Sequence, residues 1–215
     1  MKYGTVIFDM DGTILDTLED MQAAVNAALA EEGFPVRTLD EVRRFVGNGN
    51  RLLAARAVPE GAGPDAAERV LRGFHRHYRA HCADHTKAYR GVIPLIEKLR
   101  AAGVKTAVVS NKADYAVQAL AEDYFPGLFD FVTGEREGIR RKPAPDGVLA
   151  AMEALGADRA RTVYVGDSEV DLETAANAEI PCIAVCWGFR TKSELLARGA
   201  ERMADTAEAL EFLLR

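Results

Sequence analysis

The segment Val6–Asp16 constrains the fold more than any other part of the 215-residue sequence. In this segment a short apolar run ends in two aspartates one residue apart, Asp9 and Asp11, and Gly12-Thr13 follows them. A short apolar run of this kind is typical of a buried strand, and polar residues at its carboxyl end indicate a site. Because alternate residues of a strand share a face, we expect Asp9 and Asp11 to begin as neighbours.

Neighbouring carboxylates are costly to bring together, because each raises the pKa of the other unless a cation neutralises them. The pair Asp9 and Asp11 therefore indicates a metal site, or a site for acid–base and nucleophilic chemistry. The alternative interpretation is a polar strand end followed by an ordinary Asp-Gly turn at Asp11 and Gly12.

Composition narrows the class of protein. Hydrophobic residues make up 48% of the chain and charged residues 28%, which suits one packed domain or a core with an insertion. The formal net charge of −6 argues against a nucleic-acid-binding surface. Three cysteines without a dense framework fit a reducing compartment, and no segment is long and apolar enough to cross a membrane. We therefore expect a cytoplasmic protein with neither a nucleic-acid nor a membrane partner.

Residues 17–88 carry the sequence signals of helices. From Leu18 to Leu29 apolar residues recur every three or four positions, and Thr38-Leu-Asp-Glu41 has the form of a capping box. Pro64 follows a glycine and is expected to open a further helix. We predict an all-helical domain over residues 17–88, with no strand.

The rest of the chain alternates between the two kinds of element. Strands are expected at 104–109, 129–133, 162–165 and 182–185, and helices at 94–102, 113–121, 145–155, 175–178 and from 205 onward. Such alternation predicts an α/β fold with a doubly wound parallel sheet. Residues 1–16 and 89–215 would form this core domain, and the helical domain would be an insertion after the first strand.

Further polar residues follow the predicted strands. Ser110 and Asn111 come after the second strand, and Asp167 comes after the fourth, with Asp171 four residues later. Lys142 lies shortly before a helix that a proline opens. Ligands of such sheets bind at the carboxyl ends of the strands, and carboxylates with a hydroxyl and a lysine suit a metal-bound phosphate.

These motifs, in this order, resemble the haloacid dehalogenase (HAD) superfamily. Within it, the chain is most similar to the helical-cap subgroup that includes phosphoglycolate phosphatases, and the resemblance covers essentially the whole sequence. It implies a HAD-like Rossmannoid core with a mobile helical cap at 17–88. It also implies Mg²⁺-dependent hydrolysis of a small phosphorylated metabolite, with phosphoglycolate as the expected substrate.

The resemblance implies distinct roles for the acidic residues. Asp9 would be the nucleophile that forms an aspartyl-phosphate, and Asp11 would be the general acid and base. The side chains of Asp9 and Asp167 and the backbone carbonyl of Asp11 would hold Mg²⁺. Asp171 would not bind the metal ion itself but would orient the residues that do.

The resemblance also implies a phosphate-binding group and a specificity loop. Thr13, Ser110 and Lys142 would hold the phosphoryl oxygens, with Asn111 beside them. In the cap, a glycine-rich loop followed by an arginine resembles the substrate loop of phosphoglycolate phosphatases; its residues are Gly47, Asn48, Gly49 and Arg51. The alternative is that this loop is a plain turn between two helices.

Other functions remain open at this level. Asp11 favours phosphoryl chemistry over carbon–halogen cleavage, and Thr13 stands where related mutases often carry valine. A phosphomutase similar to β-phosphoglucomutase and an inorganic pyrophosphatase are the enzymatic alternatives. A receiver-like phospho-switch or a binding module is the non-enzymatic one, and a monomer or a homodimer would suit any of them.

Overall fold

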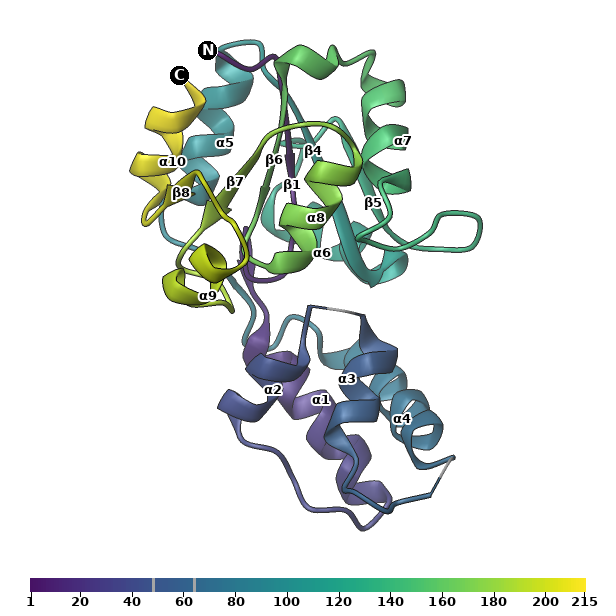
Figure 1. Ribbon diagram of the computed structural model, residues 1–215. Helices are drawn as coiled ribbons and strands as arrows, with labels where there is room; N and C mark the ends of the chain where they lie inside the picture. The colour runs from purple at the N-terminus through teal and green to yellow at the C-terminus, as the bar shows by residue number, and fades with distance from the viewer. Residues whose placement is uncertain (48, 64) are drawn as a thin grey trace. The chain divides into compact units, whose positions relative to one another are not determined.

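The computed structural model describes residues 1–47, 49–63 and 65–215 (Figure 1). The chain divides into two compact units, Met1–Leu15 with Ala88–Arg215 and Asp16–Lys87. The sequence predicted that the inserted unit would span residues 17–88, so both of its boundaries lie one residue earlier than expected. The helix start predicted at Pro64 and the loop residue Asn48 lie outside the described residues.

A parallel sheet forms the centre of the first unit. Its order is β5-β4-β1-β6-β7-β8, with β1 (Thr5–Phe8), β4 (Lys105–Ala113), β5 (Phe131–Glu135), β6 (Thr162–Gly166), β7 (Cys182–Val185) and β8 (Met203–Ala204). In register, Phe8 of β1 lies opposite Val108 of β4 and Val165 of β6. The chain segments that follow β1, β4 and β6 therefore emerge side by side at the same edge of the sheet.

Helices cover both faces of this sheet (Figure 1). They are α5 (Val92–Ala101), α6 (Asp114–Tyr124), α7 (Asp146–Leu155), α8 (Glu169–Asn177), α9 (Lys192–Ala197) and α10 (Ala207–Leu214), with a 3₁₀ turn at Arg159–Arg161. Val148 and Met152 of α7 pack in one buried cluster with Ile7 of β1 and Tyr164 of β6. The predicted doubly wound α/β fold is confirmed.

The second unit consists mainly of helices, namely α1 (Leu18–Glu31), α2 (Leu39–Phe45), α3 (Asn50–Ala57) and α4 (Ala66–His81). The predicted capping box is present, because the Thr38 N–H donates to the Glu41 carboxylate at 2.8 Å and the Glu41 N–H donates to Thr38 Oγ1 at 3.3 Å. Gly73 lets α4 approach α1, since a Cβ there would lie 2.8 Å from Ala28 Cβ.

Several predictions about elements were wrong in detail. The expectation of no strand in residues 17–88 fails at Lys87–Ala88, which form β3 and pair with β2 (Leu15–Asp16). Helix α8 begins at Glu169, well before the expected residue 175, and β5 begins at Phe131 instead of residue 129. Two-residue strands are too short to show a periodic pattern, which explains the first error. Among the described residues, no helix combines the length and apolar character that crossing a membrane requires.

Candidate active site

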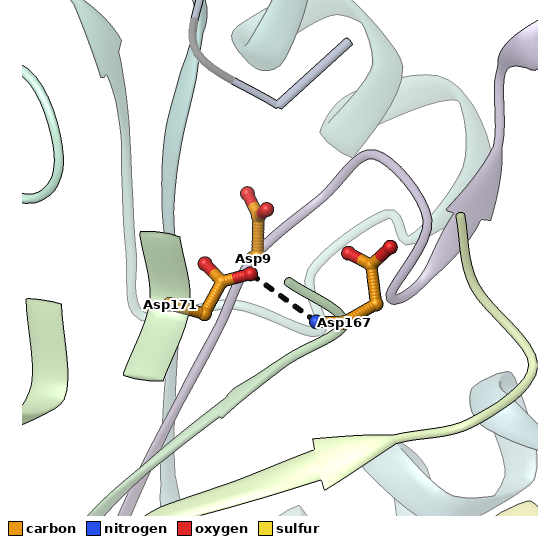
Figure 2. A group of neighbouring side chains, drawn as sticks. All are labelled: Asp9, Asp167 and Asp171. Atoms are coloured by element: carbon orange, nitrogen blue, oxygen red, sulfur yellow. Dashed lines mark hydrogen bonds between the residues drawn. The ribbon is translucent and has the colours of Figure 1, made fainter. Parts of the chain in front are cut away.

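Three buried carboxylates meet where β1 and β6 end. Asp9 follows β1, Asp167 follows β6, and Asp171 lies in the first turn of α8. One carboxylate oxygen from each lies within 4.8 Å of the others. Figure 2 shows the three side chains and the hydrogen bond that the Asp167 N–H donates to Asp171 Oδ2 at 3.2 Å. The close approach follows from the pairing of β1 with β6 in register.

Lys142 connects two of these carboxylates. Its Nζ lies 2.9 Å from Asp9 Oδ1 and 2.7 Å from Asp171 Oδ1, and its side chain is buried. Asn111 fixes the main chain of Lys142, since its Nδ2 donates to the Lys142 carbonyl at 3.0 Å and its Oδ1 accepts from the Lys142 N–H at 2.7 Å. Both ends of the Asn111 amide are therefore engaged in holding Lys142.

The electrostatics of the cluster indicate a shortage of positive charge. Burial raises the pKa of Asp9 to about 7, although Lys142 opposes the shift. Burial, and then repulsion by Asp171 and Asp9, holds the pKa of Asp167 well above its usual value. Burial lowers the pKa of Lys142, but Asp171 and Asp9 more than offset this and raise it well above normal. Lys142 thus contacts two of the three buried carboxylates, Asp9 and Asp171.

The donor set fits Mg²⁺. All three side chains offer carboxylate oxygens, which are the ligands that this cation prefers. A divalent cation would also supply the positive charge that Asp9 and Asp167 lack, because nearby positive charge favours the ionised form of a carboxyl group. The structure therefore has the residues that a magnesium site requires.

The loop after β1 is held tightly. The Met10 carbonyl accepts hydrogen bonds from the N–H groups of Thr13, Ile14 and Leu15, at 3.2, 3.0 and 3.0 Å. Gly12 has a φ of +81°, and a Cβ there would lie 2.7 Å from Asp167 Cγ. Glycine is needed at this position for both reasons.

The carboxylate of Asp167 accepts two hydrogen bonds. Thr13 Oγ1 donates to its Oδ1 at 3.1 Å, and the Phe189 N–H donates to its Oδ2 at 2.7 Å. Asp171 Oδ2 accepts from the Ser168 N–H at 3.1 Å and from Ser168 Oγ at 2.7 Å, which anchors the loop between β6 and α8. In this structure the Thr13 hydroxyl thus contacts a carboxylate, and its predicted contact with phosphate remains a prediction.

Two residues near the site were missed by the sequence analysis. Lys112 Nζ lies 2.7 Å from Asp11 Oδ1, and Tyr164 OH accepts from Lys142 Nζ at 3.0 Å. Strand β4 continues through Ala113, past the predicted end at residue 109, and Ser110 accepts from the Lys112 N–H at 3.3 Å. The pairing of β4 with β5 shifts register between Val109 and Ala113, so strand alternation alone does not locate Lys112.

The predicted specificity residues lie in the helical unit. Gly47 and Gly49 have φ values of +109° and +83°, and Gly49 precedes α3. Arg51, in the first turn of α3, forms an ion pair with Glu68 of α4 at 3.0 Å, and both side chains are exposed. Their predicted contact with substrate stays a prediction.

The geometry of the first unit can be compared with that of known proteins. A family model described as haloacid dehalogenase-like hydrolase matches residues 6–185. The chain belongs to this family. The match spans every strand end that contributes to the carboxylate cluster of this hydrolase.

Curated relatives of the hydrolase include phosphoglycolate phosphatases. One from Xanthomonas campestris pv. campestris (strain 8004) is 35% identical over 188 residues, covering 86% of this chain and 84% of that protein. One from Caulobacter vibrioides is 34% identical over 201 residues, covering 92% and 84%. The predicted family and the predicted enzyme class, a phosphatase, are confirmed.

Solved structures agree with this placement of the hydrolase. A crystal structure of a candidate phosphoglycolate phosphatase from Lactobacillus delbrueckii subsp. bulgaricus has a TM-score of 0.95 and 42% identity, covering 100% of this chain and 99% of that one. CbbY from Rhodobacter sphaeroides, crystallised in complex with phosphate, has a TM-score of 0.78 and 26% identity, covering 95% of each chain.

Proposed function

We propose that this phosphatase hydrolyses phosphoglycolate with the help of Mg²⁺, using Asp9 as the nucleophile. One observation carries the proposal: Asp9 is a buried carboxylate that Lys142 contacts at 2.9 Å, in a cluster with Asp167 and Asp171. A buried carboxylate that is positioned by a lysine and lies at strand ends suits attack on a phosphoryl group.

The side chains of Asp9 and Asp167, with the backbone carbonyl of Asp11, would hold the magnesium ion. When bound, the ion would neutralise charge on the phosphoryl oxygens and on the carboxylates around them. Asp171 is engaged by Ser168 and by Lys142, so we assign it the role of orienting both Lys142 and the Asp167 loop.

The reaction proceeds in two steps. In the first, a carboxylate oxygen of Asp9 attacks phosphorus while the bond from phosphorus to the ester oxygen breaks, and Asp11 gives a proton to that leaving oxygen. The products are an alcohol and an aspartyl-phosphate. In the second, Asp11 takes a proton from a water molecule whose oxygen attacks phosphorus, and the bond to Asp9 breaks. This releases inorganic phosphate and restores Asp9.

The other residues bind and position the phosphoryl group. Lys142 contributes a fixed positive charge, and Ser110 and Thr13 contribute hydroxyl groups. Asn111 was predicted to lie beside the phosphate, but the structure shows its amide bonded to the main chain of Lys142. We therefore assign Asn111 to the positioning of Lys142.

The choice of phosphoglycolate rests on two relatives named phosphoglycolate phosphatase, at 35% and 34% identity. We propose that the helical unit acts as a cap that sets this choice through Gly47, Gly49 and Arg51. We also place the enzyme in the cytoplasm, as a monomer or a homodimer. Cys82, Cys182 and Cys186 are joined by no disulfide in the described part of the chain, which fits that compartment.

The test is phosphate release from a panel of metabolites and one activated aryl phosphate, with and without Mg²⁺. We expect phosphoglycolate to be hydrolysed fastest, and only in the presence of the metal ion. If no compound releases phosphate, the proposal that the protein is a phosphatase is wrong. If another compound is hydrolysed faster, the proposal of phosphoglycolate as the substrate is wrong. Isomerisation of a hexose 1-phosphate without free phosphate would identify a mutase.

A variant pair tests the nucleophile. Asp9→Asn should lower kcat at least about a thousandfold, because an amide cannot form the aspartyl-phosphate. Asp123→Asn makes the same chemical change at an exposed position and should leave kcat unchanged. Full turnover by Asp9→Asn would show that another group attacks phosphorus.

A further inference from the structure

Lys112 is a buried cation that the two-step reaction above does not use. Its side chain is 2% exposed, and its Nζ lies 2.7 Å from Asp11 Oδ1. Lysine is seldom buried in proteins unless an opposite charge compensates for the lost hydration. The ion pair with Asp11 supplies such compensation, so the position of each side chain depends on the other.

The sheet explains why Lys112 reaches Asp11. Phe8, the last residue of β1, lies opposite Val108, and β4 continues five residues further to Ala113. Asp11 lies in the loop that follows β1. Lys112 therefore lies in the part of β4 that continues beyond the end of β1, and its side chain reaches the loop that holds Asp11.

The main chain and the side chain of Asp11 are held by different means. Hydrogen bonds from Thr13, Ile14 and Leu15 to the Met10 carbonyl fix the course of the loop. These bonds do not determine the side-chain torsions of Asp11, which is 17% exposed. The contact with Lys112 restricts those torsions to values that keep Oδ1 within hydrogen-bonding distance of Nζ.

The two lysines of the site have different partners. Lys142 contacts Asp9 and Asp171, whereas Lys112 contacts Asp11. Proton transfer requires the acid–base group to lie within hydrogen-bonding distance of the reacting oxygen, and an error of about 1 Å can cost about a hundredfold in rate. A residue that orients Asp11 therefore affects both proton transfers of the proposed reaction.

We propose that Lys112 is a positioning residue that holds the Asp11 carboxyl group in place for proton transfer. The inference rests on the proposed function, in which Asp11 protonates the leaving oxygen and later activates water. Its consequence is that loss of Lys112 slows the steps that need Asp11 and spares a first step that does not need it.

The experiment compares two substrates in the variant Lys112→Met. One is the alkyl phosphate that the wild type hydrolyses fastest, and the other is 4-nitrophenyl phosphate, whose leaving group departs as a stabilised anion. Since kcat/KM reports steps up to aspartyl-phosphate formation, we expect it to fall about 10- to 100-fold for the alkyl phosphate. For the aryl phosphate it should fall less than about threefold.

The ratio of the two kcat/KM values does not depend on how much of the variant is folded, so partial misfolding cannot imitate the result. Lys105→Met provides the matched control, because Lys105 is an exposed lysine on the same strand, and its ratio should equal that of the wild type. In the background of Asp11→Asn, adding Lys112→Met should cause no further loss with the alkyl phosphate, since the group that Lys112 positions is already absent.

Two results would overturn the inference. Equal losses with both substrates would indicate a general structural role, and a further loss in the Asp11→Asn background would indicate that Lys112 contacts the substrate directly. In either case the wild type still releases phosphate, so the proposed function stands. Failure of the wild type to hydrolyse either compound would instead overturn the proposed function.

Discussion

The two units of the molecule hold their charged residues in different ways. In the α/β unit, the ion pair of Lys142 with Asp171 has side chains that are 4% and 1% exposed. In the helical unit, the ion pair of Arg51 with Glu68 has side chains that are 68% and 46% exposed. Breaking a buried pair typically costs about 3–5 kcal/mol, whereas an exposed pair contributes about 0–1 kcal/mol. The residues assigned to chemistry are thus costly to change, and those assigned to specificity are not.

This difference agrees with the division of labour that we propose. The carboxylate cluster needs fixed positions because phosphoryl transfer depends on positioning and charge. The helical unit can vary its exposed residues without loss of the fold, which would let substrate preference change between relatives. Four predictions test this contrast, beginning with the largest expected effect.

The first prediction concerns Lys142→Met. We expect kcat to fall about 100- to 1000-fold, because the phosphoryl oxygens lose a fixed positive charge. We also expect the free energy of unfolding to fall by about 3–5 kcal/mol, because Asp9 and Asp171 lose their shared partner. Steady-state kinetics and urea unfolding measure the two effects. Lys98→Met, at an exposed lysine paired with Glu211, is the control and should retain full activity. A mild effect at Lys142 would contradict the assignment of a buried, fixed charge.

The second prediction uses two glycines with similar φ values. Gly12 and Gly103 have φ values of +81° and +77°, but only at Gly12 would an added Cβ meet the Asp167 carboxyl group. Both Gly→Ala variants should lose about 1 kcal/mol of stability from backbone strain. Gly12→Ala should also lose about 100-fold in kcat and bind Mg²⁺ more weakly, as measured by metal titration of activity. Equal activity in the two variants would show that the position of Asp167 tolerates this displacement.

The third prediction concerns the stability of the metal-free protein in EDTA. Because burial raises the pKa of Asp9 to about 7 from 3.8, the folded state keeps a proton that the unfolded state has already lost. The stabilisation is therefore complete below about pH 4 and is lost as the pH rises towards 7. We expect the Tm to fall by at least about 5 °C more between pH 4.5 and 7.5 in the wild type than in Asp9→Asn. Identical pH profiles would show that Asp9 does not carry the shifted pKa.

The fourth prediction concerns Arg51→Met. KM for the preferred substrate should rise up to about 10-fold with kcat little changed, and the free energy of unfolding should change by less than about 1 kcal/mol. Glu68→Gln breaks the same ion pair but keeps the guanidinium group, so its KM should stay near that of the wild type. If both variants raise KM equally, the ion pair between Arg51 and Glu68 would determine KM. Arg51 would then have no contact of its own with the substrate.

Much of the α/β unit could be predicted from the sequence, because its signals are local. The strand at Cys182–Val185 is a continuous apolar run, and its predicted ends are correct. Asp9 and Asp167 could be found because each stands at the carboxyl end of an apolar run, Asp9 directly after it and Asp167 after one glycine. In the helical unit, the capping box of Thr38 and Glu41 carries its own signature over four residues.

The remaining features depend on contacts between distant parts of the chain. The ion pair of Lys112 with Asp11 joins residues 101 positions apart, and it exists because β4 extends beyond β1. The bonds between Asn111 and Lys142 join residues 31 positions apart. Nothing in the local pattern around Asn111 distinguishes an amide that binds phosphate from one that binds main chain. Such roles are determined by packing, which a local pattern does not contain.

The short sheet of β2 and β3 has a consequence for how such enzymes diversify. The chain leaves the α/β unit after Leu15 and returns to it at Ala88, and the strands at these two points pair with each other. When the two ends of an inserted segment lie next to each other, the segment can be replaced by the corresponding segment of a relative. The replacement does not alter the order of the strands in the sheet. A chimera that carries a relative's residues between these two points should therefore fold, and it should acquire that relative's substrate range.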